Sequence, residues 1–306
     1  MSPAKRFVTY DDQVKLLCAR GMHIENEDRA KDILAWLNYY RLSGYWYPMR
    51  RFDYGTRRKC NSFIEGSSFD LVVELYKFDE RLRHDVFMEL DRVEMAIRTM
   101  LGYELGRLHP LVYLDPKSLG ARAEQRRRKD NRRKHDVWLD KYERALENSK
   151  EVFVTHHKRK YGGELPIWAA VEIMDWGMLS HLFGMSPNIV RNRIAERCAL
   201  TAPQLESWLK SLNIVRNYAA HHARMFNRVY DIKPKLSDDQ RLSSVAGKMN
   251  RTFGQLSLIQ YLHRQLHLSP AKRLPELLDA YPDNRIVPLE RTGAPRNWSD
   301  LPLWVC

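Results

Sequence analysis

The chain has 306 residues, 44% of them hydrophobic, which is enough for one large domain or two modest ones with a sizeable core. Its 51 Lys and Arg residues exceed its 38 Asp and Glu residues, and the net charge of +13 favours a polyanionic partner, with nucleic acid ahead of a membrane. The cysteines lie far apart without a C-x-x-C pair, which argues against a cysteine zinc site or a disulfide framework: they are Cys18, Cys60, Cys198 and Cys306.

Targeting and location follow from the same features. The first residues, MSPAKRFVTYDDQ, contain no apolar core, so we expect no signal peptide. No uninterrupted apolar run approaches the length of a membrane span. Together with cysteines that we expect to stay reduced, these features predict a cytoplasmic protein without a membrane partner.

Two short helices are predicted at the start of the chain. The first covers residues 11–20 and ends at Gly21. The second covers about residues 27–40, with Asn26 as its candidate N-cap. It leads directly into an aromatic segment.

The aromatic segment, NYYRLSGYWYP at 38–48, has five aromatic residues in ten positions. These rings could form a core joint where two helices meet at Gly44, and we favour this interpretation because buried aromatic rings dominate core energetics. Alternatively, they could stack on unpaired bases with Arg41 as their cationic partner.

A long helix follows. Residues 50–66 are polar and interrupted by Gly, which predicts a loop or a small hairpin. The helix is expected to run from Ser67 or Ser68 to about Gly106, because one apolar stripe has helical spacing throughout. The stripe consists of Phe69, Val72, Val73, Tyr76, Leu82, Val86, Leu90, Val93, Ile97 and Leu101.

The same helix contains one charged pair at i,i+4. Glu94 precedes Arg98 in the order that favours an ion pair on a helix surface. We therefore expect a surface ion pair, in preference to an Arg98 that faces RNA.

The most charged stretch is ARAEQRRRKDNRRKHD at 121–136, with eight cations, three acids and a net charge of +5. Such a run is often a solvated face or a flexible insertion, but it could also follow an RNA backbone. A smaller cluster precedes two glycines, and its two histidines lack the carboxylates that a metal site would need. The candidate RNA contacts in these two regions are Arg122, Arg126, Arg127, Arg128, Lys129, Arg132, Arg133, Lys134, Lys158, Arg159 and Lys160.

Three further helices are predicted before residue 230. One covers residues 165–183 with Pro166 in its first turn, and its expected core residues are Trp168, Ile173, Trp176 and Leu179. The next begins at Ser186-Pro187 and ends near Cys198. The third starts at a possible capping box, Thr201-x-x-Gln204, and is expected to continue to about Phe226.

The remaining chain is predicted to contain two more helices and an irregular end. The first helix covers about residues 238–267, and the second, shorter one begins at Ser269-Pro270. The tail from Pro282 to Cys306 is rich in proline and should be irregular.

The segment SLNIVRNYAAHHARMFNR at 211–228 carries the candidate chemistry. It has no Gly or Pro, and its apolar residues fall at helical spacings. Arg216 and His221 would then lie about 140° apart around the helix axis, so both could flank one groove. Arg is a permanent cation suited to phosphate, and His can transfer protons near neutral pH. With Asn217 between them, they could cleave a phosphodiester without a metal, although an ordinary solvated helix face has the same composition.

Several motifs resemble the Abi_2 family of abortive-infection proteins, called AbiD and AbiF. R-N-Y-A-A-H-H-x-R at 216–224 is similar to the family's R-N-x-x-A-H-H element. N-Y-Y-R-L-S-G-Y-W at 38–46 resembles its N-terminal signature, and L-Y-K-F-D-E-R-L-R at 75–83 also looks like the family. The resemblance extends over roughly residues 10–230.

The resemblance implies an all-α fold with a HEPN-like helical bundle. Its parts would be an N-terminal helical segment at 1–66, the core at 67–235 with a basic insertion at about 117–137, and C-terminal helices with a tail at 236–306. HEPN ribonucleases carry an Arg, a polar residue and, four to six positions later, a His. The implied function is therefore a metal-independent RNA endonuclease that acts as a toxin in phage defence.

The resemblance also assigns roles to residues. Arg216 and His221 would be catalytic, Asn217 would orient His221 or the phosphate, and His222 is the other candidate for the reactive imidazole. Arg41, Arg224 and Arg228 join the candidate RNA contacts. No metal or other cofactor is expected.

Partners follow from the same comparison with HEPN ribonucleases. The chain has one copy of the motif where these enzymes usually pair two, so we expect a homodimer. RNA is the expected substrate, and an RNA or protein antitoxin could restrain the activity. The alternatives are a non-catalytic protein that holds a noncoding RNA, and a helical adaptor whose site has decayed.

Overall fold

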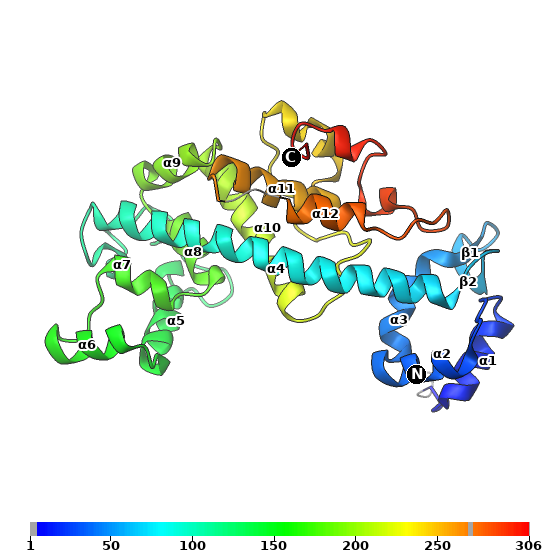
Figure 1. Cartoon of the computed structure of the whole chain (residues 1–306). Coiled ribbons are helices and arrows are strands. Elements are labelled where there is room, and N and C mark those ends of the chain that lie inside the picture. Colours follow the sequence, from blue (N-terminus) through cyan, green and yellow to red (C-terminus); the bar gives the residue numbers. More distant parts are fainter. Residues whose placement is uncertain (1–4, 269–271, 306) are drawn as a thin grey trace.

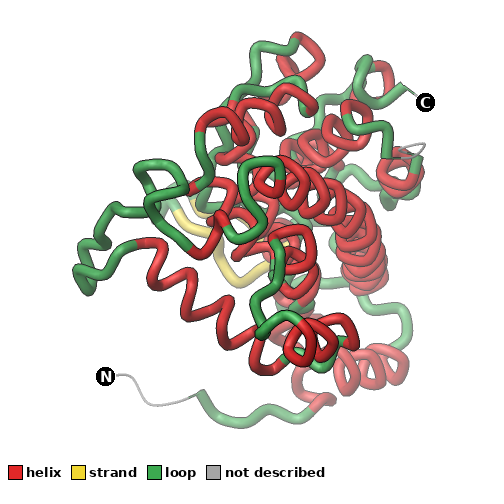
Figure 2. Tube along the Cα trace, turned by 90° about the vertical axis from the view of Figure 1, so that its left-hand side faces the viewer, coloured by secondary structure: helices red, strands yellow, loops and turns green. Residues whose placement is uncertain are grey.

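The longest helix, α4 (Phe69–Gly106), crosses almost the entire molecule, and the other elements are arranged along it (Figure 1). The computed structural model describes residues 5–268 and 272–305. With 38 residues and a rise of about 1.5 Å per residue, α4 is about 57 Å long. Ser68 caps its start, and every residue of the predicted apolar stripe is buried. The chain is mainly helical, as predicted, and Figure 2 shows one short pair of strands among the helices.

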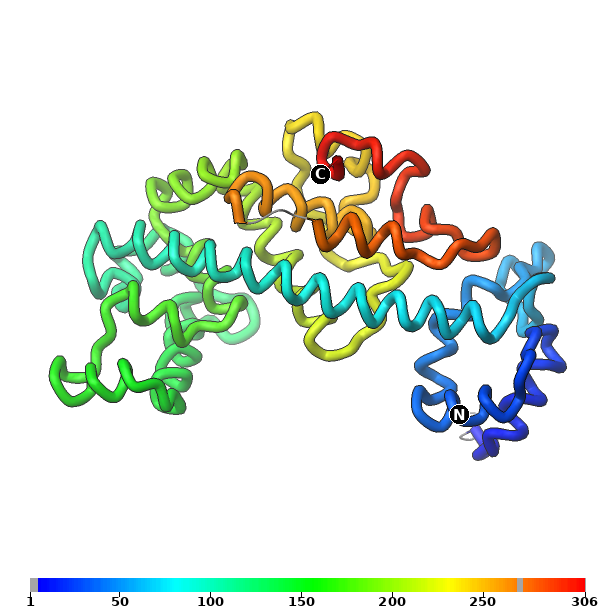
Figure 3. Tube along the Cα trace, in the orientation of Figure 1, coloured from blue at the N-terminus to red at the C-terminus, as the bar shows by residue number. Residues whose placement is uncertain are grey.

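The N-terminal elements lie at one end of α4 (Figure 3). They are α1 (Tyr10–Ala19), α2 (Glu27–Leu37), α3 (Tyr39–Trp46), a 3-10 turn η1 (Tyr47–Met49), β1 (Arg50–Asp53) and β2 (Arg58–Phe63). The two strands pair antiparallel, with Arg50 opposite Phe63 and a register shift before Phe52. Asn26 caps α2 as predicted, but the aromatic segment forms a separate helix because the chain turns at Asn38, whose φ is 60°.

A second group of helices lies at the opposite end of α4, and α10 crosses α4 between the two ends (Figure 1). The group consists of a 3-10 turn η2 (Val112–Leu114), α5 (Lys134–Asn148), α6 (Val152–Lys160), α7 (Ile167–Ala170), a 3-10 turn η3 (Val171–Ile173), α8 (Trp176–Met185) and α9 (Asn188–Arg197). Helix α10 (Ala202–Ala220) packs against α4, α8 and α9.

The C-terminal elements cover the middle of α4 (Figure 3). They are a 3-10 helix η4 (Gln240–Lys248), α11 (Thr252–Gln265), α12 (Arg273–Asp279) and the 3-10 turns η5 (Leu289–Thr292) and η6 (Trp298–Asp300). The end of the chain is irregular apart from these turns, as predicted, and Ser269 and Pro270 lie outside the described residues. No helix within 5–268 or 272–305 is both long and apolar enough to cross a bilayer.

The helix predicted over residues 165–183 is broken, and a buried arginine explains the break. Arg98 of α4 donates hydrogen bonds to the carbonyl oxygens of Val171 and Met174 where η3 ends (Nη2 to O 2.9 Å for Met174), and the Val171 oxygen also accepts from the amide of Met174 at 3.2 Å. Asp175 then caps the start of α8. Arg98 also binds Glu94 at 2.8 Å, but its side chain is only 9% exposed. The expected surface ion pair is therefore a buried one, and the guanidinium of Arg98 is not exposed.

Two other local predictions are also wrong. Trp168 is 54% exposed and does not belong to the core, although Trp176 and Leu179 do. The helix predicted over residues 238–267 is divided into η4 and α11. At the break, Asn250 accepts a hydrogen bond from the backbone of Tyr230, so tertiary pairing competes with helix continuation.

Candidate functional site

The candidate site lies at the C-terminal end of α10. The predicted capping box is confirmed at the other end of this helix, where Thr201 and Gln204 exchange hydrogen bonds. The helix ends at Ala220, however, and not at Phe226 as predicted. The candidate residues are therefore divided between a helix and the loop that follows it.

A left-handed turn ends α10. His221 is the C-cap residue, and His222 has a φ of 54°. The amide of Ala223 donates to Tyr218 O at 3.0 Å, and the amide of His222 donates to Ala219 O at 3.4 Å. This pattern is a Schellman motif, in which the left-handed position usually holds glycine. The turn directs residues 223–228 away from the helix axis.

Asn217 and His221 form an exposed pair on one face of α10. The backbone amide of His221 donates to Asn217 O at 3.0 Å, and both residues are exposed. Arg216 occupies the neighbouring face and is half-buried, with its guanidinium carbon 5.4 Å from the ring centroid of Phe87 on α4. This contact with an aromatic ring orients the cation. The end of α10 thus presents an amide and an imidazole to solvent beside an oriented guanidinium.

The structure brings Arg41 of α3 to this site. Its Nη1 donates to the carbonyl oxygen of His222 at 3.0 Å, although the two residues are 181 positions apart in sequence. Arg41 and His222 are both exposed. The N-terminal signature and the R-N-x-x-A-H-H element therefore meet in space.

A buried carboxylate fixes the loop after the turn. Asp79 of α4 is completely buried and accepts hydrogen bonds from Tyr45 Oη at 2.5 Å and Arg83 Nη1 at 2.5 Å. It also accepts from the backbone amides of Met225 at 3.1 Å and Phe226 at 2.6 Å. Burial raises the pKa of Asp79, while these donors and the charge of Arg83 favour the carboxylate. Asp79 joins three segments that are distant in sequence.

These three segments are the ones that carry the sequence resemblance. They lie at 38–46, 75–83 and 216–228, and each provides hydrogen-bond partners to the cluster around Asp79. Sequence reasoning missed Asp79. The sequence did contain a signal for Asp79, because this acidic residue lies between Tyr76 and Leu82 on the apolar stripe of α4.

Arg224 and Arg228, two candidate RNA contacts, bind the loop itself. Arg224 Nη1 donates to Phe226 O at 2.8 Å, and its side chain passes so close to Gly44 that a Cβ there would lie 3.0 Å from its Cδ and Nε. Arg228 donates to Arg224 O at 3.2 Å and stacks over the Tyr218 ring at 4.1 Å. Both arginines therefore stabilise the loop in this structure.

The predicted basic insertion forms a turn before α5. The backbones of Arg126 and Arg133 pair across the turn. Four of its cations have acidic partners: Arg122 contacts Glu206 of α10, and three others bind acids close in sequence, namely Arg127 with Asp130 at 3.3 Å, Arg132 with Asp140 at 2.8 Å, and Arg133 with Asp136 at 3.0 Å. Arg128 and Lys129 are exposed at the tip and have no ion-pair partner among the described residues.

The second basic cluster lies at the end of α6, within the group of helices at one end of α4 (Figure 1). Lys158 donates to Leu146 O at 3.3 Å, and Lys160 lies 5.5 Å from the ring centroid of Tyr161. Arg159 is exposed. The structure does not bring this cluster into contact with the end of α10.

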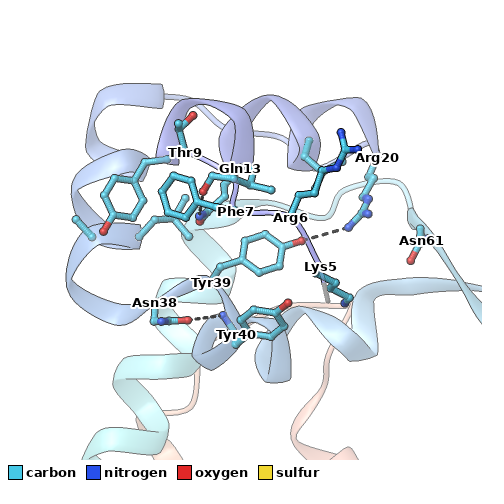
Figure 4. Close-up of a pocket in the computed structure, with 15 residues that line it drawn as sticks. Lys5, Arg6, Phe7, Thr9, Gln13, Arg20, Asn38, Tyr39, Tyr40 and Asn61 are labelled. Carbon is cyan, nitrogen blue, oxygen red and sulfur yellow. Dashed lines mark hydrogen bonds between the residues drawn. The ribbon is translucent and has the colours of Figure 1, made fainter. Parts of the chain in front are cut away.

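The aromatic segment is divided between core and surface. Tyr45 and Trp46 are buried, whereas Tyr40 is 66% exposed. Tyr39 and Tyr40 line a cavity of about 1060 Å³ beside α1 (Figure 4). Arg20 donates to Tyr39 Oη at 3.2 Å within this cavity. The core interpretation is therefore confirmed for Tyr45 and Trp46, but the two helices meet at Asn38, and Gly44 lies within α3. Stacking of the exposed ring of Tyr40 on bases stays a prediction.

The comparison with protein families agrees with the meeting of the segments at 38–46, 75–83 and 216–228 around Asp79. A family model described as Abi-like protein matches residues 32–227, which is more than half of the chain. The chain belongs to the Abi-like family. Family membership connects it with abortive infection, a form of phage defence. No curated protein and no solved structure matches the chain.

The match of the Abi-like family covers the site and its support. It begins within α2 and ends at Asn227, so it includes Asp79, the turn at His222 and Arg41. Among the described residues, no group of three or more His, Cys, Asp or Glu side chains is arranged to hold a metal ion. The chemical groups that the site offers are those of Arg216, Asn217 and His221.

Proposed function

We propose that this Abi-like protein is a metal-independent RNA endonuclease that acts as a toxin in phage defence. The single observation that carries the proposal is the end of α10, where exposed Asn217 and His221 lie beside an Arg216 oriented by Phe87. The residues form the HEPN-like combination of Arg, polar residue and His, and the Asp79 cluster holds the loop that follows them.

The proposed reaction is an internal transfer of the RNA phosphate. The 2′-oxygen attacks the adjacent phosphorus, and the bond from phosphorus to the 5′-oxygen breaks. The products are a 2′,3′-cyclic phosphate and a 5′-hydroxyl. His221 transfers protons, either from the 2′-hydroxyl or to the leaving 5′-oxygen. Arg216 stabilises the charge that develops on the phosphate oxygens, and Asn217 orients the phosphate or the imidazole.

One imidazole cannot easily take a proton and donate another in the same step. A homodimer that brings two α10 ends together would supply a second His221, so that one imidazole acts as base and the other as acid. Each protomer carries a net charge of +13, so association must overcome repulsion, and bound RNA would relieve that repulsion.

Cleavage of total RNA by the purified protein tests the proposal. The variants His221→Ala and Arg216→Ala should each lose cleavage by about 100-fold or more. His23→Ala is the matched control, because His23 is an exposed histidine outside the site. All three variants should melt within a few degrees of wild type. Cleavage by His221→Ala at the wild-type rate would refute the assignment, and His222 would be the next residue to test.

The dimer has a separate test. Light scattering should show a dimer that becomes tighter when RNA is added. Wild-type protein mixed with excess His221→Ala should lose more activity than dilution explains, because most wild-type chains would then have an inactive partner. Full activity in a monomeric preparation would contradict the dimer but not the role of His221.

A non-catalytic complex with a noncoding RNA is the second candidate, and the cavity in Figure 4 favours it. Tyr40 and the 91% exposed Phe7 lie there with Lys5 and Arg20, which is the combination of rings and cations that binds single-stranded RNA. Lys5 lies 5.6 Å from the Tyr40 ring centroid. Tight RNA binding by wild-type protein without any cleavage would support this function over the nuclease.

A further inference from the structure

A second cavity, of about 570 Å³, lies between α5, α8 and α10 and the turn before α5. Five cations line it: Arg122, Arg127, Lys134, Lys141 and Lys210. We call this cavity the basic pocket. It is separate from the cavity at the N-terminal helices and from the exposed end of α10.

The charge of the basic pocket is not balanced by its own residues. Its only carboxylate is Glu206, which Lys210 binds at 2.5 Å and Arg122 also contacts. Arg191 binds the same carboxylate at 2.7 Å. Burial would raise the pKa of Glu206, but these cations outweigh burial and hold the pKa below its usual range. One carboxylate is thus shared by three cations.

Two lysines of the basic pocket have no acidic partner among the described residues. Lys134 donates to the neutral Gln125 Oε1 at 2.8 Å, and Lys141 is exposed without an ion pair. Burial, followed by the charges of Arg122 and Lys210, lowers the pKa of Lys134. An anion bound between these groups would relieve their mutual repulsion.

One wall of the basic pocket is apolar. Trp138 is buried, and its Nε1 donates to Met178 O at 3.0 Å, which fixes the indole. Met178, Met185 and Val137 complete this wall. An apolar wall beside several cations suits a ligand with a flat ring and a phosphate.

We propose that the basic pocket binds a nucleotide through its phosphate, with the base or sugar against the wall formed by Trp138 and Met178. The ligand could be a free nucleotide or a nucleotide of an RNA strand, because both offer the same phosphate and ring.

The position of the basic pocket on α10 connects it with the candidate site, and this part of the inference rests on the proposed nuclease function. Lys210, Asn217 and His221 are separated by seven and four residues, so they share one face of the helix. Eleven residues at 1.5 Å per residue place Lys210 about 16 Å from His221 along the axis. An RNA strand held at the basic pocket would thus follow the same face toward His221.

Binding to the His221→Ala protein tests the proposal without interference from cleavage. ATP should bind, and adenosine, which lacks phosphate, should bind at least about tenfold more weakly. Lys134→Gln/Lys141→Gln should lose about tenfold or more of ATP affinity. The control is Lys77→Gln/Lys150→Gln, which removes two exposed lysines elsewhere and should bind as before. Both double variants should keep the melting temperature of the parent.

The outcomes separate the ligand sources and the two proposals. A 5′-phosphorylated RNA hexamer that binds more tightly than ATP, and loses affinity in Lys134→Gln/Lys141→Gln, identifies RNA as the occupant; weaker binding than ATP identifies a free nucleotide. Equal affinity for adenosine and ATP, or no effect of the double variant, overturns the basic pocket proposal. Neither result bears on cleavage by wild-type protein, so failure of one proposal leaves the other standing.

Discussion

The two halves of the segment 216–228 differ in their surroundings. Before the turn at His222, Asn217 and His221 face solvent and Arg216 lies at the edge of α4. After the turn, Met225 and Phe226 are buried, and their amides bind Asp79. A motif that is continuous in sequence therefore combines groups available for chemistry with groups that hold the loop in place.

The arginines illustrate this difference. Arg216 makes its aromatic contact with another helix, whereas Arg224 donates to the carbonyl of Phe226 in its own loop. Residue type alone does not distinguish an arginine that can bind phosphate from one that stabilises a loop. The surroundings decide, and variants in each half should separate activity from stability.

The largest effect on stability is expected from Asp79→Ala. Removing the carboxylate leaves Arg83, Tyr45 and two amides without their acceptor in the core, which should cost about 3–5 kcal/mol of unfolding free energy. Urea unfolding measures the loss. Asp91→Ala, an exposed acid on the same helix, should change stability by less than about 0.5 kcal/mol. A loss below about 1 kcal/mol for Asp79→Ala would show that the cluster does not hold the loop.

A smaller effect, with a reversal of sign, is expected at Gly44. In most helices Gly→Ala stabilises by about 1 kcal/mol. Here the added Cβ would lie 3.0 Å from the Arg224 side chain, so Gly44→Ala should destabilise by about 1–3 kcal/mol. In an Arg224→Ala background, the same substitution should become stabilising. Additive effects of the two substitutions in thermal unfolding would contradict the contact.

The turn itself gives the third prediction. A left-handed histidine is strained, so His222→Gly should stabilise the protein by about 1 kcal/mol. His221 has a φ of −98°, and His221→Gly should lose about 0.5–1 kcal/mol instead. Differential scanning calorimetry of both variants checks the contrast. If His221 is the reactive imidazole, His222→Gly should also retain RNA cleavage.

The smallest effect, on RNA binding, is expected at the tip of the turn before α5. There, cations without acidic partners lie next to cations that form ion pairs. Replacing Arg128 and Lys129 by Gln should lower the salt dependence of single-stranded RNA binding by about 1.4 in the log–log slope, at about 0.7 per lost phosphate contact. Arg132→Gln/Arg133→Gln removes two cations that already have acidic partners, and should change the slope less. Equal slopes for all three proteins would show that the turn does not contact RNA.

Much of the fold could be predicted from sequence where the signals are local. Ser68, Asn26 and the Thr201–Gln204 capping box mark helix starts, and the long apolar stripe identifies the buried face of α4. The wrong predictions are helix ends and breaks. They depend on distant partners, such as Arg98, which binds Val171 and Met174 in another part of the chain.

In the candidate site, too, local features could be predicted from sequence and features that depend on distant partners could not. The residues on α10 could be identified from their pattern, and the family match covers them. The end of the helix could not be predicted in this way, because the carboxylate of Asp79, which holds the following loop, is 146 positions away from Met225. Asp79 was visible as an acid on an apolar face, but its partners could not be deduced from spacing.

The contacts of the loop at 223–230 also determine when the site can form during protein synthesis. Thr252 Oγ1 donates to Met225 O at 2.8 Å, and Asn250 O accepts from the amide of Tyr230 at 2.8 Å. A nascent chain therefore lacks these supports until residue 252 has emerged from the ribosome. Arg216 and His221 are translated well before the loop beside them can be completed. An interrupted chain would carry Arg216 and His221 without their final arrangement, so the proposed cleavage would require translation of most of the protein.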